Sequence, residues 1–105
     1  MRILFDQGTP VPLREHLNSH VVETAFELGW SNLENGELLA AAESSFDLLI
    51  TTDQQIRYQQ NLAGRKLAIL VLLTTSWPRI RMCIPEICEA IEETKAGDYR
   101  EITLK

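Results

Sequence analysis

The sequence predicts one α/β domain, residues 1–105, in which parallel strands are joined by crossover helices. Short apolar runs that suit buried strands alternate along the chain with segments of helical periodicity, the order typical of a parallel sheet. Two of these runs, 2–5 and 48–52, end directly in an aspartate, Asp6 and Asp53. Because parallel strands present their carboxyl ends at one edge, where ligands of α/β proteins bind, we expect these two acids to lie side by side.

The first strand is expected at 2–5. Gly8-Thr9-Pro10 then predicts the start of a helix, since threonine is a good N-cap and proline suits the first helical position. Leu13 and Leu17 are four residues apart, which gives this helix an apolar stripe.

The second strand is expected around 20–24, followed by a short turn or helix at 25–28. Asn35 can cap the next helix, whose inward face carries three apolar residues, Leu38, Leu39 and Ala42. The third strand is expected at 47–51.

A further helix is predicted from about 53 to 62, because Thr52 and Gln55 match a capping box and Gly64 suits a helix end. The run at 67–73 is apolar throughout, as in a central strand covered on both faces.

A long amphipathic helix is predicted from about 78 to 95, followed by a helix-ending Gly97 and an edge strand at 99–104. Pro85 lies inside this helix and predicts a kink or break near residue 84. The apolar side of the helix could serve a homodimer as easily as a core; its residues are Ile84, Ile87, Cys88 and Ile91.

Composition narrows the class of protein. The apolar share of 45% is ordinary for a globular domain, and no apolar run approaches the roughly 20 residues that span a bilayer. Asp6 and Gln7 interrupt any apolar stretch that could act as a secretory signal. We therefore expect a cytoplasmic protein with no membrane partner.

The net charge of −5 argues weakly against nucleic-acid binding, but the charges are unevenly distributed. The segment 54–85 contains no acid and five basic residues, which are Arg57, Arg65, Lys66, Arg79 and Arg81. This segment could be a footprint for a polyanion, or its charges could be scattered and solvated.

The acids after the strands predict a metal site. Asp6 needs a hydrogen-bonded turn, such as an Asx-turn with Gly8, or a cation. Asp53 and Glu37 both stand near expected helix starts, where acids also complement the helix dipole. A carboxylate cluster formed by Asp6, Asp53 and a third acid would suit Mg²⁺ or Mn²⁺, which prefer oxygen ligands. Glu34 and Asn35 are alternatives to Glu37 as the third ligand.

The segment after Asp53 is rich in amides and suits contacts to RNA. Its candidate substrate-binding residues are Gln54, Gln55, Arg57, Tyr58 and Asn61. Arginine and amides can grip a phosphate backbone, and a tyrosine can stack on an unpaired base. The alternative is a solvated helix in which Tyr58 is half-buried.

Three stretches together resemble the DUF5615 group of small PIN-like proteins over most of residues 1–75. They are Ile3-Leu4-Phe5-Asp6-Gln7, Asn35-Gly36-Glu37-Leu38-Leu39, and 46–54 followed by 57–61. The resemblance implies a three-layer α/β/α fold with a central, mainly parallel sheet of four or five strands. It also implies a Mg²⁺- or Mn²⁺-dependent ribonuclease, often the toxin of a toxin–antitoxin pair, with metal ligands and catalytic acids at Asp6, Glu37 and Asp53. An antitoxin protein would then be a partner.

The chain also departs from the pattern of many PIN nucleases. Many relatives have an aspartate where Asn35 stands, and Thr74-Thr75-Ser76 occupies the place of their fourth acid. Two other interpretations therefore stay open. One is a PIN-like binding module that has lost nuclease activity. The other is a receiver-like phosphoacceptor domain, which also has acids after its first and third strands but normally has an adjacent acid pair where this chain has Asp6-Gln7.

Overall fold

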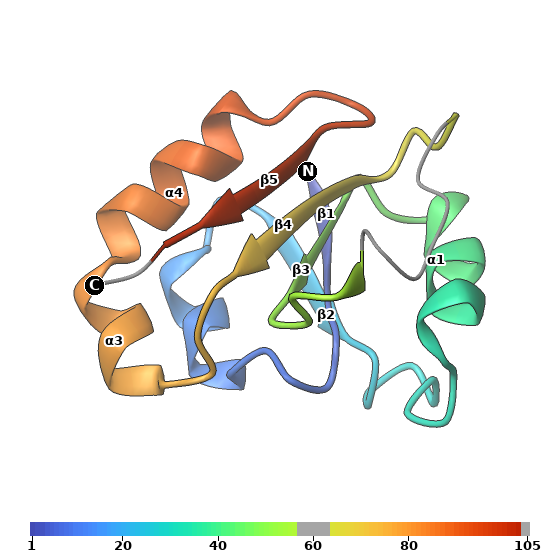
Figure 1. Ribbon diagram of the computed structural model, residues 1–105, viewed down its shortest axis with the longest axis horizontal. Helices are drawn as coiled ribbons and strands as arrows, with labels where there is room; N and C mark the ends of the chain where they lie inside the picture. The colour runs from blue at the N-terminus through green and yellow to red at the C-terminus, as the bar shows by residue number, and fades with distance from the viewer. Residues whose placement is uncertain (57–63, 104–105) are drawn as a thin grey trace.

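The centre of the molecule is a five-stranded parallel sheet with the order β2-β1-β3-β4-β5 (Figure 1). The computed structural model describes residues 1–56 and 64–103. The strands are β1 (Arg2–Phe5), β2 (Val21–Thr24), β3 (Leu48–Thr51), β4 (Ala68–Leu72) and β5 (Tyr99–Ile102). The predicted α/β class and parallel sheet are confirmed, and each run expected to be a strand contains one.

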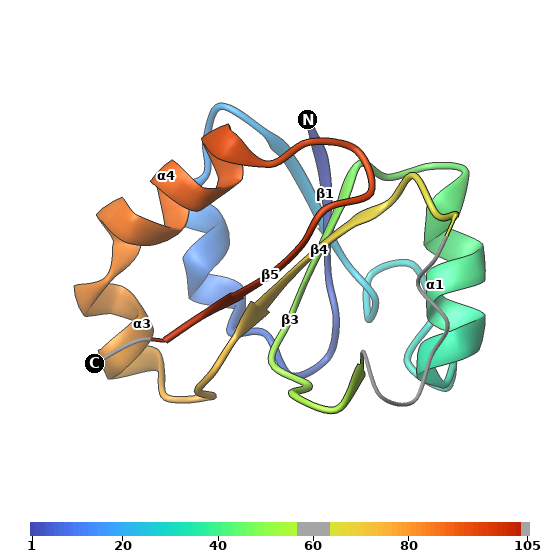
Figure 2. The ribbon, with the colours of Figure 1, turned by 45° about the horizontal axis from the view of Figure 1, so that its top comes forward.

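Helices cover both faces of the sheet, so the fold has three layers (Figure 2). On one face lie the 3₁₀ helix η1 (Val11–His16) and the helices α3 (Trp77–Met82) and α4 (Ile84–Glu93). The other face packs against α1 (Asn35–Glu43). None of the described helices is long and apolar enough to cross a membrane.

The alternation of side chains along the strands builds two separate cores. Ile3 and Phe5 of β1 point to the face of η1, α3 and α4, whereas Leu4 points to the face of α1. Every residue of β4 is buried, as expected for a strand covered on both faces.

β1 and β3 are direct neighbours, and their register positions the acids that follow them. Ile3 pairs with Leu48 and Phe5 with Ile50, so Asp6 comes next to the end of β3. The chain continues from β1 to β2 on one side, whereas β3 lies on the other side of β1. This change of direction is a topological switch point, where the carboxyl ends of neighbouring strands open a crevice.

The long helix predicted at 78–95 is divided in two, which confirms the break expected from Pro85. α3 ends at Met82 and α4 begins at Ile84. Proline in a helix interior has no N–H to donate and its ring clashes with the preceding turn, so the chain restarts the helix there.

The prediction that Thr9 caps the first helix is wrong. That helix is η1, which begins at Val11 with Pro10 at the N-cap position, and its N-cap makes no side-chain hydrogen bond. The hydroxyl of Thr9 is used elsewhere, since its Oγ1 lies 2.7 Å from Asp6 Oδ1 and 2.8 Å from the carbonyl oxygen of Ile50.

The expected capping box after β3 is also wrong. The backbone N–H of Gln55 donates to Asp53 Oδ1 at 2.9 Å and not to Thr52. An aspartate can accept from the N–H two residues ahead in an Asx-turn, and here that contact prevails. Most of the helix predicted at 53–62 lies outside the described residues.

Candidate metal site at the carboxyl edge of the sheet

Asp6 is partly buried at the end of β1 and is held by two threonine hydroxyls. Thr9 Oγ1 is 2.7 Å from Asp6 Oδ1, and Thr51 Oγ1 donates to Asp6 Oδ2. Burial raises the pKa of the Asp6 carboxyl, while the hydrogen bonds from Thr51, Thr9 and the backbone of Gly8 act in the opposite direction. The Asx-turn with Gly8 and a role in ligand binding are therefore compatible.

Asp53 lies at the same edge, two residues after Thr51, the last residue of β3. Its Oδ1 accepts the backbone N–H of Gln55, and its Oδ2 accepts Nδ2 of Asn35. Asn35 opens α1, so the first turn of this helix is tied directly to the turn after β3.

Thr51 joins the two aspartates. Its buried hydroxyl donates to Asp6 and accepts the backbone N–H of Asp53 at 3.1 Å. One hydroxyl therefore links the Asp6 carboxylate to the backbone of Asp53, and the turns that carry the two acids lie at the same edge of the sheet. Sequence reasoning did not single out Thr51; the only signal was a polar residue at the end of an otherwise apolar strand.

Gly8 lets the turns after β1 and β3 pack closely. A Cβ added at Gly8 would collide with Oγ1 of Thr52, so a side chain at position 8 would require Thr52 to shift. The edge is thus assembled from two turns that contact each other.

Glu37 is the predicted ligand that this arrangement does not bring to the aspartates. It is exposed, and its Oε1 accepts the backbone N–H of Glu34 at 3.2 Å, which stabilises the start of α1. Glu34 is the N-cap and Asn35 the first helical residue, so the prediction that Asn35 caps α1 is wrong by one position. Asn35 is the residue of α1 that contacts Asp53.

The carboxylates alone do not form a complete site in the part of the chain that is described. Within residues 1–56 and 64–103, no group of three or more His, Cys, Asp or Glu side chains is arranged to hold a metal ion. The oxygen donors at this edge are two carboxylates, the hydroxyls of Thr9 and Thr51, and the amide oxygen of Asn35 if that amide turns over. Such a set suits a hard divalent cation better than zinc.

The predicted substrate-binding residues are only partly described. Gln54 and Gln55 are exposed just after Asp53. Arg57, Tyr58 and Asn61 lie outside the described residues.

The basic segment 54–85 does not form one patch in its described part. Arg65 and Lys66 precede β4, whereas Arg79 and Arg81 belong to α3, which follows β4. Arg65 also pairs with Glu43 at 3.5 Å. The strand separates the two basic pairs, which favours the interpretation of scattered charges for these four residues.

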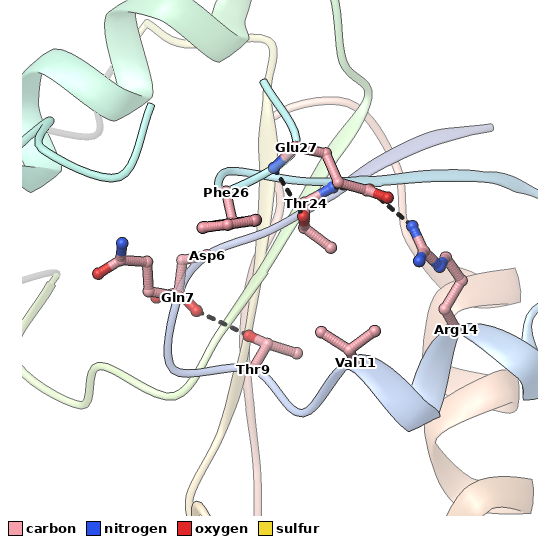
Figure 3. A pocket seen from close by; sticks show the side chains of 8 residues that line it. All are labelled: Asp6, Gln7, Thr9, Val11, Arg14, Thr24, Phe26 and Glu27. Carbon is pink, nitrogen blue, oxygen red and sulfur yellow. Dashed lines mark hydrogen bonds and ion pairs between the residues drawn. The ribbon is translucent and has the colours of Figure 1, made fainter. Parts of the chain in front are cut away.

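Two hollows open beside Asp6. The smaller, about 120 Å³, lies toward α1 and is lined by Asp6, Gln7, Gly8, Ala25, Trp30, Ser31, Leu33, Asn35 and Leu38. The larger, about 550 Å³, lies toward η1 and β2 and is lined by Asp6, Gln7, Thr9, Val11, Arg14, Thr24, Phe26 and Glu27 (Figure 3). Asp6 therefore stands between a small polar hollow that includes Asn35 and a wider, more apolar one.

Comparisons with protein-family models, with curated proteins and with solved structures found no match to this chain.

Proposed function

We propose that this protein is a Mg²⁺- or Mn²⁺-dependent ribonuclease of the PIN-like type, with its metal site at Asp6 and Asp53. The observation that carries the proposal is the link through Thr51 at the switch point between β1 and β3, where its hydroxyl donates to the Asp6 carboxylate and accepts the backbone N–H of Asp53. This is where α/β sheets bind ligands. The resemblance to DUF5615 proteins supports the same assignment.

The residues at this edge fit a divalent cation in their chemistry. Each carboxylate oxygen can accept two hydrogen bonds or ligands, so the contacts of Asp6 and Asp53 leave lone pairs free. Asn35 could supply a neutral amide oxygen, or Glu37 could leave the N–H of Glu34 and supply a carboxylate. When bound, such an ion would activate a water and neutralise charge on a phosphodiester.

The contribution of the chain itself would be to place the acids in advance. Thr51 and Thr9 fix the Asp6 carboxylate, and Asn35 with the N–H of Gln55 fixes that of Asp53. Burial favours the protonated form of Asp6, so cation binding would release a proton from any Asp6 that carries one.

The test is cleavage of single-stranded RNA in Mg²⁺ or Mn²⁺ by the wild type and by Asp6→Asn and Asp53→Asn. Asp47→Asn is a matched control, because Asp47 directly precedes the strand that Asp53 follows and so lies at the opposite edge. We expect both site variants to lose at least about a hundredfold in rate, since they weaken the stabilisation of transition-state charge. Equal loss in Asp47→Asn, or activity that survives both site changes, would refute the assignment.

A binding module without catalysis is the first alternative. It is favoured by the small number of carboxylates at the described part of the site. Calorimetry with Mn²⁺ separates the two: RNA binding without metal binding or cleavage would support the module and reject the nuclease.

A phosphoacceptor domain is the second alternative, and the strand order favours it. The order 2-1-3-4-5 is the flavodoxin-like one, which receiver domains share. Against it, Asp53 is engaged by Asn35 and by the N–H of Gln55, and Asp6 is followed by Gln7 where receivers have a second acid. A mass increase of one phosphoryl group after incubation with acetyl phosphate, absent in Asp53→Asn, would establish it.

The toxin role rests on the resemblance alone. Induced expression in a bacterial host should then arrest growth in the wild type but not in Asp6→Asn. A neutralising antitoxin protein should restore growth.

A further inference from the structure

The larger hollow beside Asp6 has an exposed aromatic ring on its wall. Phe26 is 78% exposed and Val11 is 48% exposed, although both are large apolar residues. Figure 3 shows Phe26 on the same side of the hollow as Asp6 and Gln7, with Arg14 and Glu27 across from them. We call this hollow the Phe26 pocket.

The turn that carries Phe26 is fixed by its neighbours. Ala25 is buried, and its N–H donates to the carbonyl of Phe5 at 2.8 Å; the N–H of Trp30 donates back to the carbonyl of Ala25 at 2.8 Å. Leu28 and Trp30 pack against the core on the α1 face, whereas Phe26 does not. The ring is thus held out at the pocket by an anchored backbone, and its apolar surface remains in contact with water.

The charges around the pocket cancel except at Asp6. Arg14 Nη1 is 2.6 Å from Glu27 Oε1, and the same oxygen accepts the N–H of Thr24 at 3.0 Å. The hydrogen bond from Arg14, followed by that from Thr24, lowers the pKa of the Glu27 carboxyl, so this pair stays ionised and internally neutralised. No free cation is left among these wall residues to bind a phosphate inside the pocket, so the occupant should be uncharged and planar.

We propose that the Phe26 pocket receives one unpaired base of single-stranded RNA, stacked on Phe26, while the neighbouring phosphodiester lies at Asp6. This inference rests on the proposed function, because Asp6 belongs to both the pocket and the metal site. The volume of about 550 Å³ falls within the range of small-ligand sites. Stacking on an aromatic side chain is how unpaired bases are commonly bound, and it tolerates any base.

The experiment measures the Kd of a ten-nucleotide, fluorescein-labelled single-stranded RNA by anisotropy, with Ca²⁺ replacing Mg²⁺ to suppress cleavage. Phe26→Ala removes the ring and Phe26→Tyr keeps it. Val21→Ala is the matched control, since Val21 is 57% exposed at the start of β2, the strand that leads to Phe26, and does not line the pocket. We expect Phe26→Ala to weaken binding about tenfold, and Phe26→Tyr and Val21→Ala to bind like the wild type.

Two further probes distinguish stacking from a merely structural role of Phe26. Single abasic substitutions along the RNA should weaken binding by the wild type at one position but leave Phe26→Ala unaffected there. Binding of a duplex RNA should not change in Phe26→Ala, because paired bases cannot enter the pocket.

The outcomes separate this inference from the nuclease assignment. If the wild type cleaves RNA and Phe26→Ala binds the labelled RNA equally well, the pocket proposal fails and the nuclease stands. If Phe26→Ala loses single-strand binding but no variant cleaves, the pocket stands and the nuclease fails. If the wild type does not bind the labelled RNA at all, the pocket proposal is overturned.

Discussion

Thr51→Val should lower the free energy of unfolding by an amount that depends on pH. Valine has nearly the shape of threonine, so the change removes the hydroxyl and little else from a fully buried position. Two hydrogen bonds disappear: the one donated to Asp6 and the one accepted from the N–H of Asp53.

The expected loss follows from the nature of the two bonds. A hydrogen bond to an ionised carboxylate contributes about 1.5–3 kcal/mol, and one between neutral groups about 0.5–1.5 kcal/mol. At neutral pH, with Asp6 ionised, the free energy of unfolding should therefore fall by roughly 2–4 kcal/mol.

The loss of unfolding free energy in Thr51→Val should be smaller at acidic pH. The Thr51 hydroxyl lowers the pKa of Asp6 against the effect of burial, so without it the carboxyl in the folded state has a still higher pKa. Below the ordinary carboxyl pKa of about 4, Asp6 is protonated in the folded and unfolded states alike, and only neutral bonds are lost. The difference between wild type and variant should then be smaller by about 1 kcal/mol.

Urea unfolding in metal-free buffer at about pH 7 and about pH 3 measures this difference. Thr94→Val is the matched control, since the Thr94 hydroxyl makes one neutral hydrogen bond, 2.7 Å to the carbonyl of Ala90 at the end of α4. Its loss should be about 0.5–1.5 kcal/mol at both pH values. A Thr51→Val loss that equals the control and ignores pH would refute the bridging role of this hydroxyl.

Two other substitutions test the carboxyl edge of the sheet, at Asp6, and the opposite edge, at Gly97. Without metal, the stability of Asp6→Asn relative to the wild type should increase as pH rises from 4 to 7. The reason is that burial raises the pKa of Asp6 in the folded state, so the wild type loses the favourable contribution of protonated Asp6 as pH rises through that pKa. With Mn²⁺ at about a hundred times its Kd the wild type should gain about 2.7 kcal/mol, read as a shift in Tm, and Asp6→Asn should gain none; a gain in Asp6→Asn would remove Asp6 from the site. In urea unfolding, Gly97→Ala should lower the free energy of unfolding by at least about 1 kcal/mol more than Gly29→Ala. Both glycines have a positive φ, 80° at Gly97 and 73° at Gly29. Only at Gly97 would the new Cβ meet a backbone oxygen, that of Arg65 at 3.0 Å. Equal losses of unfolding free energy in the two variants would mean that the backbone near Gly97 shifts without a measurable energetic penalty.

Strands β1, β3 and β4 were predictable because each contains a continuous apolar run that is followed by polar or turn-forming residues. β4 is the clearest case, since an uninterrupted apolar run of this length has no solvent face. The break before α4 was predictable as well, because it follows from the covalent structure of Pro85 alone.

The hydroxyl contacts were not predictable from local patterns. Thr9 and Thr52 stand where capping statistics favour them, but a cap competes with acceptors that tertiary structure brings close. For Thr9 that acceptor is the carbonyl of Ile50, which is 41 positions away in the sequence. Local sequence propensity does not include a hydrogen-bond partner that comes close only when β1 and β3 pair.

The placement of Asp6 and Asp53 at one edge of the sheet was predictable from the parallel order of the strands. Acids that follow two parallel strands share an edge, but their closeness also requires β1 and β3 to be neighbours. The choice between Asn35 and Glu37 was beyond sequence reasoning, because both open the same helix and only their side-chain directions separate them. Phe26 was missed for a similar reason: its exposure depends on which way the turn after β2 faces.

The basic segment 54–85 shows that a cluster of charges in the sequence of this fold does not imply a charged patch on the surface. Every strand of a parallel sheet carries the chain from one edge to the other, so a window that spans β4 mixes residues of both edges. Arg65 precedes that strand, pairs with Glu43 and lies far from the aspartates, whereas Arg79 comes after the strand. Asp6 and Asp53, by contrast, are 47 positions apart and lie at the same edge because each follows the end of a strand. In a parallel sheet the position of a charge relative to the nearest strand end is therefore a better guide to a site than the charge counted along a stretch of sequence.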